Sequence, residues 1–241
     1  MSDAVTVPAG RAFLMGLVLI ATLSGCADDP VTAGPTHPPI PRRPVPLPPD
    51  PRPTLMVESV SLDVEDVPVT QVVAQLARGR GIEIVHADGL NADLLARPVT
   101  VRLERVSPAS ALHWVLQSAG LTYTFHENWV VVTESARMSA DEVDRADRFR
   151  ANLDRTWRPA LERDLLQNKL TVDIENIPAA EVFDLVREHY RLNCIAPPPF
   201  LRKTVTLNVE ERPLVEVLDV LAEAMNARWT LEYEAVHFSP L

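Results

Sequence analysis

Few residues in this chain fall into a pattern that could do acid–base chemistry. The closest are paired carboxylates: Asp63 and Glu65 alternate with apolar residues, and Asp173 and Glu175 do the same later in the chain. Two neighbouring carboxyl groups could act as a general acid and a general base. No nucleophile or glycine-rich pocket segment accompanies them. We therefore favour solvated charges on the outer face of a strand.

Metal, phosphate and redox motifs are also missing from the sequence. No H-E-x-x-H, G-x-S-x-G, phosphate-loop or C-x-x-C pattern occurs. We therefore expect no catalytic residues, no cofactor and no metal site, and hence no enzyme. The net charge is −10 over 241 residues, which argues against a nucleic-acid partner. Apolar residues make up 46% of the chain, enough for a buried core.

The clearest chemistry belongs to Cys26. Arg11 is followed by an apolar run over residues 12–23 and then by small residues, which is typical of a secretory segment too short to span a bilayer comfortably. The sequence Leu23-Ser24-Gly25-Cys26 resembles the lipobox of bacterial lipoproteins. That resemblance implies a signal peptide over residues 1–25, lipid attachment at Cys26, and a palmitate-type anchor. The alternative is an uncleaved apolar anchor with an accidental cysteine.

A proline-rich stretch follows the cysteine, and residues 30–53 hold half of the 22 prolines. Because proline lacks a backbone donor, we expect this stretch to join no helix or sheet and to form an extended spacer within a linker over residues 26–54. A ligand for a proline-binding groove is the alternative. The lipoprotein resemblance implies a location in the cell envelope, facing the periplasm, and Ala27 after Cys26 resembles lipoproteins sorted to the outer membrane, which is favoured over the inner.

An internal repeat organises the rest of the chain. Residues 60–85 align with residues 170–195, and residues 99–125 align with residues 205–231. In each copy, alternation predicts a first strand, and apolar residues at helical spacing predict the helix after it. Asp66 is the expected cap of that helix, with Pro68 in its first turn. A second strand, a third strand, a helix capped by Ser107 and a closing hairpin follow, so the order is βαββαβ plus one strand.

Three further residues are interpreted from this alignment. His113 lies opposite Asp219 of the second copy, which favours a solvated helix face over a metal ligand. Cys194 lies in an apolar strand and is interpreted as a small core residue. Trp129 is a candidate hot spot for protein binding, because aromatic residues dominate interface energies. Packing of Trp129 in its own core is the alternative.

Residues 135–168, between the copies, are rich in Asp, Glu and Arg. Opposite charges at helical spacing predict a solvated helix that ends at the residue before Pro159. A flexible charged loop is the alternative.

The repeated strand, turn and helix pattern, with Val64-Glu65-Asp66-Val67-Pro68 and Ile174-Glu175-Asn176-Ile177-Pro178 at corresponding places, resembles the STN family. These are the short N-terminal modules of secretins and TonB-dependent receptors. The resemblance implies an α+β fold with one module over residues 55–134 and a second over residues 169–241. It also implies protein–protein docking in the periplasm without an active site.

We therefore expect a non-enzymatic, lipid-anchored adaptor accessory to a secretin-type secretion or pilus system. Its expected partners are the membrane, through the lipid, and an envelope protein such as a secretion component. A signalling module of a TonB-receptor and anti-sigma pathway is the alternative, and an envelope ligand-binding or hydrolytic lipoprotein is a third hypothesis.

Overall fold

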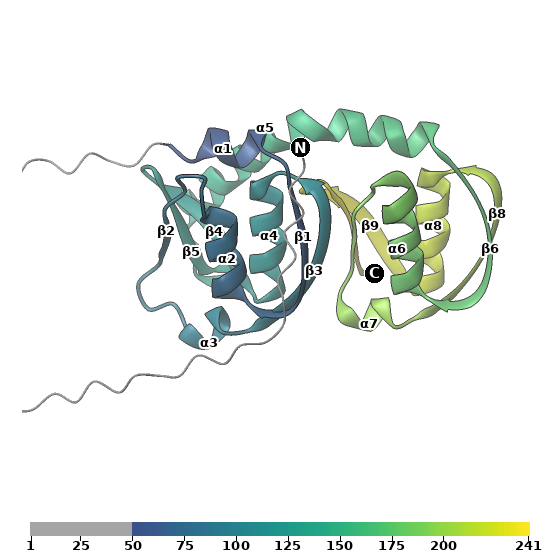
Figure 1. Ribbon diagram of the computed structural model, residues 1–241, viewed down its shortest axis with the longest axis horizontal. Helices are drawn as coiled ribbons and strands as arrows, with labels where there is room; N and C mark the ends of the chain where they lie inside the picture. Colours follow the sequence, from purple (N-terminus) through teal and green to yellow (C-terminus); the bar gives the residue numbers. More distant parts are fainter. Residues whose placement is uncertain (1–49) are drawn as a thin grey trace, which may run out of the picture. The chain divides into compact units, whose positions relative to one another are not determined.

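The computed structural model describes residues 50–241 (Figure 1). The expected signal peptide, Cys26 and most of the proline-rich linker lie outside the described residues. The described part begins with helix α1, Arg52–Val57, which has Pro53 in its first turn. The expectation that the proline-rich stretch joins no helix is therefore wrong at its end. A first-turn proline loses no hydrogen bond, since its N–H would have no partner there.

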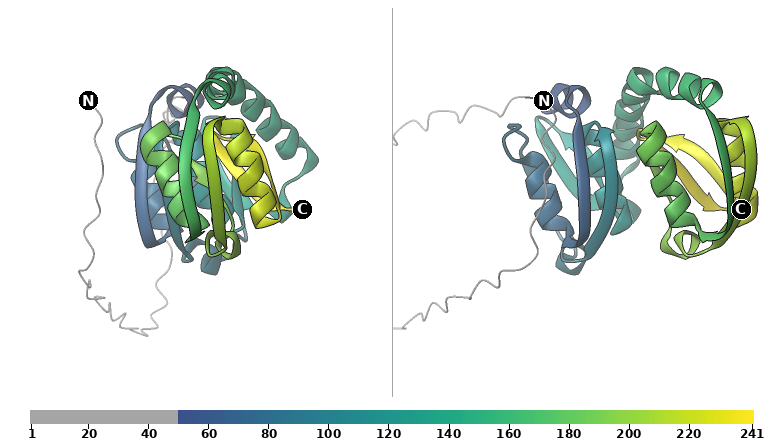
Figure 2. Two further views of the ribbon diagram at one scale, coloured as in Figure 1. Left: turned by 90° about the vertical axis from the view of Figure 1, so that its right-hand side faces the viewer. Right: turned by 45° about the vertical axis from the view of Figure 1, so that its right-hand side comes forward.

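The first half of the described chain is an α+β fold with two small sheets. Its elements are β1 Val60–Pro68, α2 Val69–Ala77, β2 Ile84–His86, α3 Ala92–Leu95, β3 Pro98–Val106, α4 Pro108–Ser118, β4 Leu121–His126 and β5 Trp129–Glu134. Strands β1 and β3 form an antiparallel pair. Strand β5 lies between β2, which is parallel to it, and β4, which is antiparallel. Helices α2 and α4 pack between the two sheets (Figures 1 and 2).

The second half has the same order of elements and the same strand pairings. Its elements are β6 Lys169–Pro178, α6 Ala179–Tyr190, β7 Cys194–Ile195, α7 Pro198–Leu201, β8 Thr204–Pro213, α8 Leu214–Met225, β9 Ala227–Glu232 and β10 Ala235–Pro240. Strand β6 pairs with β8, and β10 lies between β7 and β9. The predicted mixed α+β class is confirmed. The short helices α3 and α7 were not predicted.

The two paired strands of each half are bulged at corresponding positions. Asp66 and Asn176 have φ of 56° and 57°. Their backbone N–H groups donate to the hydroxyls of Thr100 and Thr206, each at 3.1 Å. A second bulge in each half repeats the arrangement: Arg105 N–H donates to Ser61 Oγ at 3.1 Å, and Glu211 N–H donates to Thr171 Oγ1 at 2.9 Å. A hydroxyl on the partner strand thus satisfies each amide that the bulge removes from the ladder.

The bulge corrects the role predicted for Asp66. Helix α2 begins at Val69 with Pro68 as its N-cap and has no side-chain cap. The Val69 N–H instead donates to Arg97 O at 3.0 Å, so a backbone carbonyl takes the place of the expected carboxylate. The cap predicted for α4 is confirmed, because the Ser107 side chain accepts from the Ser110 N–H.

The two halves are joined by a 3-10 turn, Ser135–Arg137, and by helix α5, Ala140–Gln167. Helix α5 begins with a reciprocal capping box between Ser139 and Glu142 and continues past Pro159, so the predicted end before Pro159 is wrong. Nor is this helix solvated on all sides, since Phe149, Leu153, Trp157 and Leu165 are buried. Apolar anchors on both sides of the exposed Pro159 hold the helix together where the proline removes one hydrogen bond.

Candidate functional site: the joint between the halves

The two halves meet where the turn between β9 and β10 contacts helix α4. The Trp114 side chain is 3% exposed, and its indole Nε1–H donates to Tyr233 O at 3.0 Å. The His113 ring stacks on the Tyr233 ring, with centroids 3.5 Å apart and an interplanar angle of 11°. The solvated face predicted for His113 is therefore wrong, because the second half covers it.

The N-terminus of α4 binds a carboxylate from the same turn. The backbone N–H and the hydroxyl of Ser107 both donate to Glu234 Oε2, each at 2.6 Å. Ser107 is 3% exposed, so these bonds are shielded from water. Hydrogen bonds to an ionised group are stronger than neutral ones, and a helix N-terminus favours negative charge. Glu234 thus fixes the second half against the start of α4.

A third contact joins strand β3 to the loop before β7. The Asn193 amide donates from Nδ2 to Glu104 O at 3.0 Å and accepts at Oδ1 from Glu104 N at 2.8 Å. The side chain thereby reproduces the paired bonds that a neighbouring strand would make. Asn193 is 3% exposed. On the outer side of β3, Arg102 forms ion pairs with Asp63 at 3.1 Å and with Asp184 of α6 at 3.7 Å.

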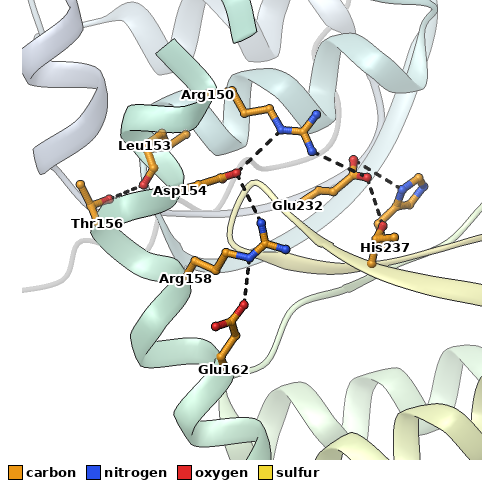
Figure 3. Close-up of polar contacts among 9 residues, drawn as sticks. Arg150, Leu153, Asp154, Thr156, Arg158, Glu162, Glu232 and His237 are labelled. Carbon is orange, nitrogen blue, oxygen red and sulfur yellow. Dashed lines mark hydrogen bonds and ion pairs between the residues drawn. The ribbon is translucent and has the colours of Figure 1, made fainter. Parts of the chain in front are cut away.

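Helix α5 adds a chain of charged groups to the joint (Figure 3). Arg150 lies between Asp154 and Glu232, 3.9 Å from each, and Glu232 is also 3.9 Å from His237 Nδ1. Arg158 lies 3.9 Å from Asp154, and a shorter contact of 3.0 Å joins it to Glu162. Most of these separations are long and the arginines are partly exposed, so the network orients α5 more than it stabilises it.

Burial at the joint shifts several pKa values. Desolvation lowers the pKa of His113 to about 3, with the Arg150 charge acting in the same direction. Desolvation also raises the pKa of Tyr233 to about 12 and raises the pKa of Asp154. His237 has a lowered pKa for the same reason, opposed by Glu232. At neutral pH the stacked His113 and Tyr233 rings are therefore both uncharged.

Shifted pKa values can mark an active site when the groups line a cleft. Surface hollows of about 560 Å³ and 390 Å³ lie elsewhere in residues 50–241, and His113, Tyr233 and Asp154 line neither of these two. Around these three residues, the contacts described above are ring stacking and ion pairing within the chain. The shifts are explained by packing of the joint, which can hold two halves together without any reaction.

Of the residues singled out from the sequence, His113 lies at this joint, whereas Trp129 and Cys194 take no part in the contacts described above. Trp129 is half-buried at the start of β5, opposite His126 in the hairpin with β4. Its Nε1 is buried without a hydrogen-bond partner among residues 50–241. Cys194 is buried in β7, where desolvation raises the pKa of its thiol to about 12. The candidate role of Trp129 in binding stays a prediction, as does lipid attachment at Cys26.

The repeated carboxylates have different partners in the two halves. Asp63 pairs with Arg102, which also contacts Asp184 across the joint, and Asp173 accepts from Asn208 Nδ2 at 3.2 Å. No group of three or more His, Cys, Asp or Glu side chains in residues 50–241 is placed to bind a metal ion. In the same part of the chain, no helix combines the length and the hydropathy needed to cross a membrane.

Ser107, Trp114, Asn193 and Glu234 form the joint, and none was singled out as a contact residue. One signal was present in the sequence of α4, PASALHWVLQS, whose polar stripe of Ser110, His113 and Gln117 holds no Asp, Glu, Lys or Arg and lies beside Trp114. The matching stripe of α8 is Glu216, Asp219 and Glu223, beside Val220. A helix face without charge and with a large aromatic residue is more often covered than a charged one, so the difference between the copies pointed to extra cover over α4.

Comparisons with known proteins give little beyond this geometry. No family model matches the sequence, and no curated protein matches it. One solved structure, titled "Structure of XcpQN012", is similar over 68% of this chain and 97% of its own length, with 11% sequence identity and a TM-score of 0.28. A similarity of that size carries no functional argument, so function must be inferred from contacts within this chain.

Proposed function

We propose that this chain is a non-enzymatic docking protein of the bacterial cell envelope, anchored through lipid on Cys26 and accessory to a secretin-type secretion or pilus system. Residues 55–134 and 169–241 would be two copies of one STN-like or secretin-N0-like module. A protein of this kind works by presenting its surfaces to a partner at a fixed distance from a membrane.

The observation that carries the proposal is the repeated, bulged strand pair. Each half has the same two bulges, closed by a hydroxyl from the partner strand, within the same order of elements. Matching irregularities of this kind support two copies of one module better than chance similarity of small sheets. The same strand, turn and helix residues carry the resemblance to the STN family, and the docking role is what that resemblance implies.

The joint supports a rigid two-module arrangement. Trp114 contributes a buried hydrogen bond between the halves, Ser107 and Asn193 contribute partly buried ones, and α5 contacts both halves. Two surfaces held in a fixed orientation lose less entropy on binding than two modules on a flexible linker. An adaptor that must reach one site on a large assembly benefits from such an arrangement.

The anchor is tested by growing cells that express the full chain with labelled palmitate. We expect Cys26→Ser to abolish incorporation of the label and to leave an unprocessed precursor. Cys194→Ser is the matched control and should keep the label, since that thiol is buried in β7. Labelling of the Cys26→Ser chain would contradict the anchor.

The docking role is tested separately, by chemical cross-linking in cells followed by purification of the full chain from membranes. We expect an envelope secretion or pilus component to be enriched over an unrelated lipoprotein carrying the same tag. The Cys26→Ser chain should recover less of it, because the anchor concentrates the protein at the membrane. Recovery of no envelope protein above background would refute an adaptor.

A further inference from the structure

Helices α4 and α8 occupy corresponding places in the two halves but differ in what covers them. Trp114 of α4 is 3% exposed, whereas Val220, at the corresponding position of α8, is 41% exposed. Ser110 is buried, while its counterpart Glu216 is exposed. His113 stacks on Tyr233, while its counterpart Asp219 is exposed. The β9–β10 turn covers α4, and within residues 50–241 no such turn covers α8.

The uncovered surface is defined here as the open face of α8: Glu216, Asp219, Val220 and Glu223, all exposed. Its chemistry is the reverse of the surface on α4. At the N-terminus of α4, the N–H and the hydroxyl of Ser107 donate to a carboxylate. The counterpart of Ser107 in the second half is Pro213, which has neither an N–H nor a hydroxyl. Glu216 also places a negative charge in the first turn of α8. An acidic turn like that of Glu234 would be repelled there.

A shallow hollow of about 560 Å³ adjoins the open face. Asp219, Glu223 and Trp229 are among the residues that line it, together with Arg228. The Trp229 indole donates to Asp219 Oδ1 at 2.8 Å, which holds the ring beside the carboxylate. An indole face next to carboxylates suits a guanidinium or ammonium group. At the joint, Arg150 of α5 lies 5.4 Å from the centroid of the Tyr233 ring in the covering turn, so a cation–aromatic contact also occurs where that turn covers α4.

A second copy of this chain is a poor occupant. The turn of the first half that corresponds to Tyr233–Glu234 is Glu127–Asn128, and the counterpart of Asn193 is Glu83. Glu127, the counterpart of Tyr233, would meet Asp219 with like charge, and Glu83, the counterpart of Asn193, would offer β8 a carboxylate that cannot donate to a backbone carbonyl. The occupant should therefore be a different chain whose hairpin carries positive charge.

We propose that the open face of α8 binds the tip of a β-hairpin from another envelope protein, and that this tip carries Arg or Lys against Trp229, Asp219 and Glu223. The proposal rests on the docking function and specifies its partner. The internal joint supplies the model for the contact: a hairpin turn laid across the middle helix of a module.

The test places a photo-activatable residue at Val220 of the full chain in its bacterial host and identifies cross-linked peptides by mass spectrometry. The matched control carries the same residue at Glu188, which is exposed on α6. We expect a Val220 adduct with a peptide of another protein that includes a turn between two strands and an Arg or Lys. Asp219→Asn with Glu223→Gln should lower the yield of that adduct by at least about threefold, through loss of exposed ionic contacts.

Four results would overturn the proposal. They are an adduct with this chain's own peptides, an adduct with a segment lacking a turn or a cation, no Val220 adduct above the Glu188 control, and an unchanged yield in the neutralised variant. Far-UV circular dichroism of that variant checks that it folds. If chemical cross-linking still enriches an envelope partner while Val220 gives no adduct, the docking function stands and only the binding face is wrong.

Discussion

The contact between Trp114 and Tyr233 gives a sharp test of the joint. Trp114→Phe keeps most of the ring but removes the N–H that donates to Tyr233 O at 3.0 Å. That carbonyl is then left without its donor in a site where Trp114 is 3% exposed. An unsatisfied buried polar group costs about 1–3 kcal/mol, and the smaller ring adds roughly 1 kcal/mol from lost packing.

Trp229→Phe is the matched control. Its indole N–H also donates, at 2.8 Å, but the acceptor is the exposed Asp219, which water can solvate after the change. We therefore expect Trp114→Phe to lower the free energy of unfolding by about 2–4 kcal/mol and Trp229→Phe by less than about 1 kcal/mol. The measurement is urea unfolding of the full chain followed by far-UV circular dichroism. Equal losses in the two variants would refute the inference that the indole bond stabilises the joint.

Three other changes test the same structure. Glu234→Ala should lower the free energy of unfolding by about 1.5–3 kcal/mol, because Ser107 loses a charged acceptor, while Glu188→Ala should leave it within about 0.5 kcal/mol. The pKa of His113 is about 3 in the folded chain and 6.5 in the unfolded chain, so only the unfolded chain takes up the proton between those values. The free energy of unfolding should therefore fall by up to about 1.4 kcal/mol for each unit by which the pH is lowered from 6.5 towards 3. His113→Phe should flatten that slope, and an unchanged slope would show that other groups cause it. Pro159→Ala should raise the thermal midpoint, since it restores a helical hydrogen bond worth up to about 3 kcal/mol with the change in propensity.

The order of elements could be predicted because the residues of each strand and helix keep their own period. Val60, Leu62 and Val64 alternate with polar residues, and β1 begins where that alternation begins. The bulge could not be predicted as easily. Glu65 and Asp66 are adjacent polar residues, which fit either the end of a strand or an extra residue in the ladder. In the structure Asp66 is an extra residue in the ladder, because the hydroxyl of Thr100 accepts from the Asp66 N–H that the bulge removes from strand pairing.

The joint was harder to predict than the fold. Burial of His113 depends on Tyr233, which lies 120 positions later in the sequence, and no local pattern connects the two. Likewise Pro159 is a good local signal for the end of a helix, but buried residues on both sides of it, Trp157 and Leu165, continue the helix. Contacts distant in sequence decided both cases against the local preference.

Helix α5 has a mechanical consequence. Its 28 residues account for about 42 Å of helical rise from one half to the other, with Pro159 inside it. Buried residues on both sides of Pro159 fix the helix to both halves, so a displacement imposed on one half would be carried to the other through these contacts. Asn193 and Glu234 add hydrogen bonds between the halves, and separating the halves would break several of these bonds at once. Under load, the two halves should therefore move together before the chain between them stretches.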